Sequence, residues 1–579
     1  MNFSFLDWLV LFATLLSIIS YGVYKGRSSR NLEGYFLGDR QLHWRVVLLS
    51  VMGTQASAVT FLTVPGQSFT DGMRFVQFYF GLPIAMIVLS ITFVPIFRKL
   101  NVYTAYEYLE QRFDKKTRTL ASVIFLVSRG LSTAISIVAP SLILHSLLGW
   151  NIYLTNIAMG GLMIIYTVSG GAKAVAYTQQ IQFIIIYVAM FTVGWWAIKS
   201  LPHGIGIIDA LHIAGKSEKL NIVTTGINKK GFDWNDRYNI WSGLIGGFFL
   251  QLSYFGTDQS QVGRYLTAKT TAESKISLLM NGLIKIPLQF AILLIGIFIF
   301  VFYQFNQRPI YFNPSQEKLL IQGPYSEEYK ILKGRYLELQ GERRDLLLSS
   351  ADNKPLMKDE MLKEKLGQYE ERLNAIRNEI SAVIKKSNPT ADVNDKDANY
   401  VFLRFVGDHI PPGLVGLIVA IIFLAAWSSI AAALNALASS TIIDLHKQFA
   451  KKSLSSISEY RWSKWYTLLW GIFCVLTTFF AINVGNSLVE AVNILGSWFY
   501  GVLLGIFLVA FFFKNINGTP VFYAAIITEI LVIIISLQGQ ISFLWFTIIG
   551  AIAVVILSYF FQKILGYQKI VDSQPLPPV

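Results

Sequence analysis

The chain has 579 residues, of which 53% are apolar and only 15% are charged, and its mean hydropathy is +0.49. This composition excludes an ordinary soluble protein and indicates residence in a membrane. The net charge of +14 would suit a nucleic-acid-binding protein, but the basic residues gather in loops between apolar segments. That distribution is typical of a surface that faces anionic lipid, so no nucleic-acid partner is expected.

About thirteen segments are apolar and long enough to cross a bilayer as helices, since roughly 20 apolar residues span the hydrocarbon core. The first has no small-residue cleavage site after it and is expected to be a retained helix rather than a signal peptide. The expected spans are 5–24, 46–69, 76–97, 119–147, 152–170, 178–200, 241–262, 276–303, 411–443, 463–482, 487–513, 519–537 and 541–562.

Lysine and arginine are abundant after the first, third, seventh and ninth expected spans, in loops that share one side if the spans alternate. This positive-inside pattern predicts a multi-pass protein of the cell (inner or plasma) membrane, with its N-terminus outside and its C-terminus in the cytoplasm. The single cysteine, Cys474, lies within an apolar span and cannot form an intrachain disulfide.

The segment 304–404 is strongly charged and does not belong in lipid. Apolar residues recur at spacings of three and four over 362–383, and again over 329–346 with Arg343 in the seam. Because SADNKP (350–355) carries turn residues between the two stripes, we expect an antiparallel coiled-coil hairpin outside the membrane. The two helices either pack only on each other or present a docking surface to another protein.

Two expected spans are poor lipid-facing helices. GTQASAVTFLTVPG (53–66) is rich in Gly, Ser, Thr and Gln, and the span 241–262 ends in QLSYFGTDQSQVGRYL (251–266), which places Asp258 at its cytoplasmic end. These spans are the second and the seventh, five apart and opposite in direction, which predicts an inverted-repeat transporter.

The expected fold is therefore an all-α membrane protein: a five-plus-five inverted-repeat core with one extra N-terminal and two extra C-terminal helices. No catalytic set is found, because the histidines form no His-x-x-x-His pair and no phosphate-binding loop is present, so an enzyme is not expected. The expected parts are an N-terminal helix and loop (1–45), a first repeat (46–200), an outer loop (201–240), a second repeat (241–303 and 405–513), the insertion (304–404) and C-terminal helices with a tail (514–579).

Two adjacent hydroxyls, Ser428 and Ser429, lie among alanines in the ninth expected span. Sodium is a hard cation that prefers oxygen ligands, and carbonyls freed where a helix breaks can hold such an ion. The carbonyls of Met52 and Gln55 in the interrupted second span, with that of Ala425, could complete a shell around the serines. The alternative is that small residues here only permit close helix packing.

These residues lie within a wider resemblance to the sodium:solute symporter family, over about residues 1–300 and 405–515. The pattern TQASAVTFLTVPG is most similar to the branch that transports small anions and monocarboxylates. The stretches that carry the resemblance are RNLEGYFLGDRQLHW (30–44), GGAKAVAYTQQIQ (170–182), GTDQSQVGRYLTAKT (256–270) and AAWSSIAAALNALASSTIIDLH (425–446).

The resemblance implies symport by alternating access, with Na⁺ as the coupled ion. By position it makes the residues named above the sodium site: Met52, Gln55, Ala425, Ser428 and Ser429. It also implies that Thr54, Gln251 and Lys285 lie at the solute site and that Tyr254 closes this site on its inner side. Only Gln251 keeps an amide of the kind that sugar-binding members use, so a sugar substrate is not expected. Gln179 stands where many members have an aspartate, so a second sodium ion is not expected.

Two cations lie in the middle of expected spans, Arg129 and Lys285. Because an unpaired cation in hydrocarbon is costly, both are expected to face protein or a water-filled cavity, with Glu490 and Glu529 as the candidate acids. An arginine can grip a carboxylate bidentately, whereas a lysine acts as a point charge. We therefore expect Arg129 to bind an anionic solute; the alternative is a structural arginine whose N–H groups are satisfied by carbonyls or by a buried acid.

The sequence thus predicts a sodium-coupled symporter of a small anionic or carboxylate solute, with the solute, sodium ion and membrane lipid as partners. A solute sensor that signals through the 304–404 insertion is one alternative. A symporter of a neutral sugar or amino acid is another.

Overall fold

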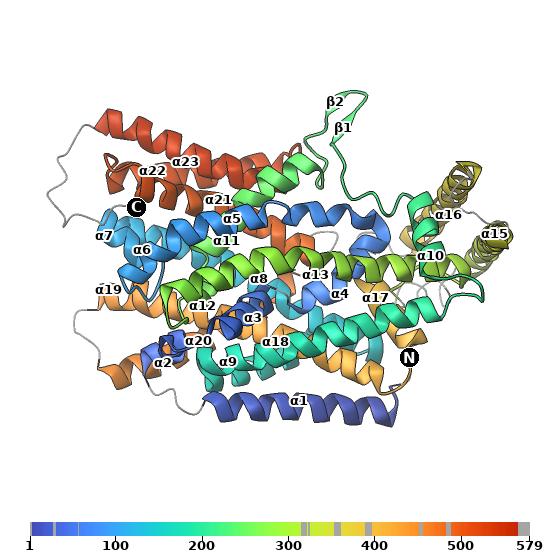
Figure 1. The fold of residues 1–579 in the computed structure, drawn as a ribbon, viewed down its shortest axis with the longest axis horizontal. Helices are drawn as coiled ribbons and strands as arrows, with labels where there is room; N and C mark the ends of the chain where they lie inside the picture. The colour runs from blue at the N-terminus through green and yellow to red at the C-terminus, as the bar shows by residue number, and fades with distance from the viewer. Residues whose placement is uncertain are drawn as a thin grey trace.

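The computed structural model describes residues 3–26, 31–55, 57–313, 321, 325–352, 360–387, 397–450, 455–481 and 488–565. Almost all elements are helices that run side by side along one axis (Figure 1). A short antiparallel hairpin, β1 (Ile227–Asn228) and β2 (Gly231–Phe232), projects from the loop before the second half. The all-α fold expected from the sequence is confirmed.

The first half of the chain supplies two edge helices, a broken helix and several long spans. Its elements are α1 (Phe5–Gly26), α2 (Leu32–Leu37), η1 (Gly38–Arg40), α3 (Trp44–Gln55), α4 (Ala58–Asp71), η2 (Gly72–Tyr79), α5 (Leu82–Ile91), α6 (Phe93–Lys99), α7 (Glu107–Arg112), α8 (Lys115–Leu148), α9 (Ile152–Lys199) and α10 (Ile207–Lys216).

The second half contains another broken helix, the insertion and the C-terminal helices. Its elements are η3 (Ser242–Gly246), α11 (Gly247–Thr257), α12 (Gln259–Tyr265), α13 (Thr271–Phe305), α15 (Ser326–Asp352), α16 (Glu360–Ser387), α17 (Ala398–His409), α18 (Leu414–Ser440), η5 (Thr441–His446), α19 (Lys447–Phe449), α20 (Ser456–Ala481), α21 (Leu488–Phe512), α22 (Gly518–Leu537) and α23 (Phe543–Leu565).

Within the described residues, 9 helical segments are long and apolar enough to cross a membrane. They are fewer than the expected spans because some spans are broken into short helices and others are joined. Helix α9 runs through two expected spans and changes direction at Gly171, whose φ of 62° suits a residue without a Cβ. The expectation of about thirteen spans therefore stays a prediction.

Both predicted interruptions are present. Helix α3 ends at Gln55 and α4 begins at Ala58, with Ser57 extended at φ −80° and ψ 174°. Between α11 and α12, Asp258 is extended at φ −79° and ψ 115°, and its carboxylate caps α12 by accepting the N–H of Ser260 at 2.8 Å. Each broken helix leaves backbone groups without helical partners in the interior of the bundle.

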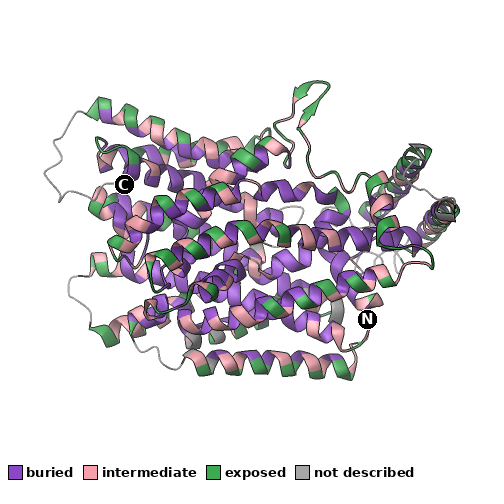
Figure 2. Ribbon diagram, viewed as in Figure 1, coloured by how far each residue is buried: buried purple, intermediate pink, exposed green. Residues whose placement is uncertain are grey.

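Helix α18 is buried along nearly its whole length, as the purple ribbon in Figure 2 shows. Its alanines and serines let neighbouring helices approach it closely on every side. At the edges the opposite holds: α1 exposes Phe5, Leu9, Phe12 and Leu16. Helices α22 and α23 lie at the other edge of the same view (Figure 1). Exposed apolar faces of this extent are typical of contact with lipid.

The insertion contains the two helices expected from its apolar stripes, α15 and α16, at the end of the bundle where α1 begins (Figure 1). They pack through a small core of their own, and the coiled-coil geometry itself stays a prediction. The second half of the expected turn, 353–355, lies outside the described residues, whereas its first half, 350–352, belongs to α15. The apolar residues of this core are Tyr329, Leu332, Tyr336, Leu339, Leu373, Ile376, Ile380, Val383 and Ile384, with Ile310 and Tyr311 from the preceding loop.

Candidate functional site

A cavity of about 100 Å³ lies where the two broken helices meet. Its walls come from the junction of α3 and α4, from η2, α8 and α11, and from the first turns of α21. Four of the residues predicted for the site line it, namely Gln55, Arg129, Gln251 and Tyr254. The remaining lining residues are Ser57, Val59, Thr60, Phe78, Tyr79, Leu250, Val489, Val492, Asn493 and Tyr500.

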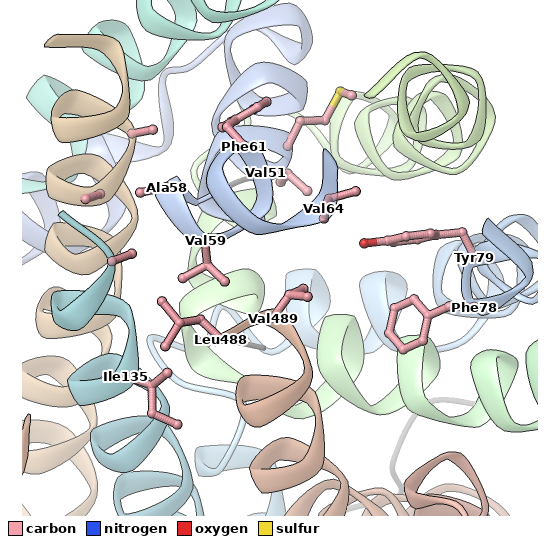
Figure 3. Close-up of a cluster of buried hydrophobic side chains, with 14 of the residues drawn as sticks. Val51, Ala58, Val59, Phe61, Val64, Phe78, Tyr79, Ile135, Leu488 and Val489 are labelled. Atoms are coloured by element: carbon pink, nitrogen blue, oxygen red, sulfur yellow. The ribbon is translucent and has the colours of Figure 1, made fainter. Parts of the chain in front are cut away.

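One wall of this cavity is apolar. Figure 3 shows Val59 of α4, Val489 of α21 and the rings of Phe78 and Tyr79 of η2 directed toward one space from three different elements. Polar groups therefore meet a solute only at a few points, and the rest of its surface is covered by side chains that exclude water.

Arg129 reaches the cavity from α8 and is paired with an acid. Its Nη1 lies 3.6 Å from Oδ2 of Asp258, which is fully buried at the break between α11 and α12. The hydroxyl of Tyr500 donates to the same Oδ2 at 2.8 Å. The charge of Arg129 is thus compensated within the protein.

The acids that the sequence offered as partners are the wrong ones. Glu490 pairs with Arg237 of the loop before η3. Both carboxylate oxygens of Glu529 are buried with no hydrogen-bond partner in the described part of the chain. Asp258 was overlooked because it was placed at the cytoplasmic end of the seventh span; the helix breaks at this residue, which brings the carboxylate into the interior.

Lys285 lies one layer behind the cavity rather than in its wall. Its side chain is 1% exposed, and Nζ lies 5.6 Å from the centre of the Tyr79 ring, which does line the cavity. No carboxylate of the described residues lies within ion-pair distance of this ammonium group. Cation–π contact with Tyr79 offsets only part of the cost of burying the charge.

Thr54 and Tyr254 also have protein partners. The hydroxyl of Thr54 donates to the Ser50 carbonyl at 2.8 Å, and this residue does not line the cavity. The hydroxyl of Tyr254 accepts the amide N–H of Gln261 at 2.7 Å, and its ring lies 5.8 Å from that of Tyr500. Tyr254 therefore joins the two halves of the second broken helix at the cavity wall.

The residues predicted to bind sodium lie on α3 and α18, where all except the half-buried Gln55 are buried. Because α3 ends at Gln55, carbonyls of its last turn have no partners within the helix. On α18 the hydroxyl of Ser428 lies 3.1 Å from the Ala425 carbonyl, and that of Ser429 donates to the Ala426 carbonyl at 3.1 Å. Such freed carbonyls and hydroxyls are the donor set that a hard cation prefers.

Gln179 of α9 joins these two helices, a role that the sequence did not reveal. Its Oε1 accepts the Ser50 hydroxyl at 2.7 Å, while its Nε2 donates to the Thr54 hydroxyl at 3.2 Å and to the Ser428 carbonyl at 3.4 Å. A Cβ on Gly53 would lie 3.3 Å from the Gln179 side chain, so the small residue permits the approach. The only signal in the sequence was an amide at a position where relatives often have an acid.

Comparison with known proteins identifies the family to which this architecture belongs. The family model described as the sodium:solute symporter family matches residues 35–317 and 381–528. This chain belongs to the sodium:solute symporter family. Membership makes it a sodium-coupled solute transporter and not an enzyme, with sodium as the coupled ion. The unmatched stretch, 318–380, contains α15 and most of α16.

Individual relatives of this symporter are named for different anions. The sodium/iodide cotransporter of Homo sapiens is 29% identical over 304 residues, 51% of this chain and 45% of that protein. The chain thus spans less than half the length of that relative. The sodium-coupled monocarboxylate transporter 1 of Xenopus laevis is 28% identical over 526 residues, 89% of this chain and 69% of that protein.

The fold of the symporter also matches a solved structure, that of a Na⁺-coupled sialic acid symporter in a substrate-bound outward-open state. The TM-score is 0.74 at 23% sequence identity, and the alignment covers 98% of this chain and 100% of that one. At this identity the likeness establishes the fold alone.

Proposed function

We propose that this symporter moves a small carboxylate anion together with sodium, and that the anion binds in the cavity between Arg129 and Lys285. The observation that carries the proposal is the charge around the cavity. Two cations lie at or directly behind its wall, and Asp258 is the one described carboxylate within ion-pair distance of either. One of the two positive charges therefore has no described carboxylate to neutralise it.

An anion in the cavity would balance that excess. A lone cation in a membrane interior costs from about 2.5 to over 10 kcal/mol, so binding an anion next to Lys285 recovers part of this cost. Arg129 would orient the carboxylate of the solute and keep its own ion pair with Asp258, because a planar guanidinium has enough N–H groups for two acids. The relatives named for iodide and for monocarboxylates support an anionic solute.

The volume of the cavity supports a small solute. An apolar cavity of about 150 Å³ is large enough for benzene, so one of about 100 Å³ suits a solute of roughly four non-hydrogen atoms. A short monocarboxylate fits this limit, whereas a sugar acid would require the cavity to widen.

We assign the sodium site to the carbonyls of Met52, Gln55 and Ala425 and the hydroxyls of Ser428 and Ser429. Its proposed role is to tie the end of α3 to α18, so that the ion stabilises the arrangement in which the cavity is complete. Movement of one elementary charge across a potential of 100 mV supplies about 2.3 kcal/mol to such a cycle.

Alternating access follows from the same arrangement. Tyr254 would close the cavity on the side of α12, because its hydroxyl is bonded to Gln261 beyond the break. Release of the solute toward that side would require this contact to open.

The test is a thermal-shift screen of the purified symporter in sodium and then in potassium, followed by uptake in proteoliposomes. We expect a short monocarboxylate such as acetate to stabilise the protein in sodium only, and to be taken up in proportion to the sodium gradient. Stabilisation by a neutral sugar or amino acid, with none by any anion, would contradict the proposed substrate class. Binding without flux would instead favour a sensor.

A further inference from the structure

The insertion rests on the end of the bundle at which α4, the second half of the first broken helix, terminates. An open cleft of about 730 Å³ lies between α16 and the ends of α10 and α13. The insertion is thus not packed on the core along its whole length. Leu347 of α15 and Leu362 and Leu366 of α16 pack into the main core. Charged and polar links add to these apolar contacts, and three of the links lead to α4.

The first link is a cluster around Glu370 of α16, in which the glutamate is half-buried and its two arginine partners are buried. Its carboxylate pairs with Arg308 of the loop that follows α13 at 3.1 Å and with Arg343 of α15 at 3.3 Å. Arg343 is 1% exposed and also donates to the Tyr303 carbonyl at the end of α13, at 3.1 Å. The guanidinium of Arg308 lies 5.0 Å from the centre of the Phe69 ring on α4.

This cluster depends on a single negative charge. Burial by itself raises the pKa of the Glu370 carboxyl, but the two guanidinium groups outweigh burial and leave that pKa lowered. Removal of the charge would leave two buried cations facing each other, which strongly disfavours the docked arrangement.

The second link passes through α17. Arg377 of α16 pairs with Asp397 at 2.5 Å, and the same Asp397 accepts the N–H of Asn313 at 3.0 Å. Helix α17 begins at the next residue, Ala398, whose carbonyl oxygen lies 1.8 Å from the place that a Cβ on Gly66 would occupy. The backbones of α17 and α4 are therefore in direct contact.

The third link passes through the end of α10. Lys363 of α16 pairs with Glu218 at 2.8 Å. The adjacent Lys219 donates its Nζ to the Thr70 carbonyl in the last turn of α4, and its own carbonyl accepts the N–H of Met73 at 2.8 Å. The last turn of α4 is thus held by elements fastened to the insertion.

We propose that the insertion is a clamp on the outer end of α4, defined here as Gly66–Asp71, and that it restrains opening of the solute cavity on this side. The first residues of α4, Ser57 to Thr60, belong to the cavity wall or lie beside it. Any opening that tilts α4 must therefore strain or break these links. The clamp presupposes the alternating access of the proposed function, but it makes no assumption about the solute.

The test measures access to the cavity rather than transport, so its outcome does not depend on the substrate assignment. Cys474, which is fully buried, is changed to serine, and Val489→Cys in the cavity wall serves as the reporter. The rate at which a bulky maleimide labels this reporter is measured in nanodiscs. Glu370→Gln is compared with Glu379→Gln, whose carboxylate pairs, within the described part of the chain, with Arg335 of the insertion alone, at 3.4 Å.

We expect Glu370→Gln to raise the labelling rate roughly tenfold, within the range usual for coupling between distant sites, and Glu379→Gln to leave it unchanged. Lys363→Gln breaks an exposed pair, so it cannot unfold the core and should raise the rate roughly twofold. If Glu370→Gln is poorly folded, the labelling rate of Lys363→Gln tests the clamp in its place. Equal rates in the parent, the Lys363 variant and every folded Glu370 variant would overturn the clamp.

Discussion

The strongest prediction concerns Lys285→Met, which removes the unbalanced positive charge and keeps an unbranched apolar side chain. Nζ of Lys285 lies 5.6 Å from the centre of the Tyr79 ring, and Tyr79 lines the cavity. An anion in contact with the cavity side of this ring would thus lie about 9 Å from the ammonium, where an effective dielectric constant of about 20 gives an attraction of about 1.8 kcal/mol. We expect the Kd of the carboxylate to rise roughly twentyfold.

The assay is equilibrium binding of the carboxylate at saturating sodium, with sodium affinity measured separately. Lys275→Met is the matched control, because it makes the same change on α13 about 15 Å away along the helix. The unfolding temperature of Lys285→Met should not fall, since the substitution removes a buried charge that has no carboxylate partner among the described residues.

A Kd within twofold of the parent in Lys285→Met would refute the reasoning, because the excess charge would then have no part in binding. A loss of equal size in Lys275→Met would refute it as well, since the effect would then be a long-range field and not a local contact.

Ser428→Ala should weaken sodium activation by about 2 kcal/mol, roughly thirtyfold, whereas Ser439→Ala on the same helix should not; equal sodium affinities would show that the serine only packs. Arg129→Met should lower the free energy of unfolding by about 3 kcal/mol or more by leaving Asp258 unpaired, and adding Asp258→Asn should restore most of it in calorimetry. The Glu370 carboxyl has a pKa below its ordinary 4.5, since neighbouring guanidinium groups outweigh burial, so its stabilisation of the docked insertion is complete above that pH. A spin label on α16 should gain mobility only as the pH falls through the lowered pKa.

The features that the sequence predicted are those set by local chemistry. The run around Gln55 breaks because its small and polar residues make a poor lipid-facing helix, and α15 and α16 follow from apolar residues at helical spacing. Pro65 did not end its helix, since α4 continues to Asp71. In a membrane the groups that such a proline frees are satisfied by neighbouring helices.

The partners of the site residues could not be predicted from the sequence. Arg129 and Asp258 are far apart in the chain and meet only because α11 stops at that aspartate. Gln179 reaches the Ser428 carbonyl only because α9 and α18 pack against each other where these two residues lie. Contacts of this kind depend on where helices end and how they pack together, and no periodicity within one segment encodes them.

The hydrogen bond between Asn313 and Asp397 has a consequence for the history and engineering of the protein. The chain leaves the core and returns to it at a single point, so a segment between these residues can be gained or lost without stretching the helices on either side. The insertion is in this sense a removable module. A short linker in its place should yield a symporter that still assembles but lacks the clamp, and the same junction offers a place to graft an unrelated domain.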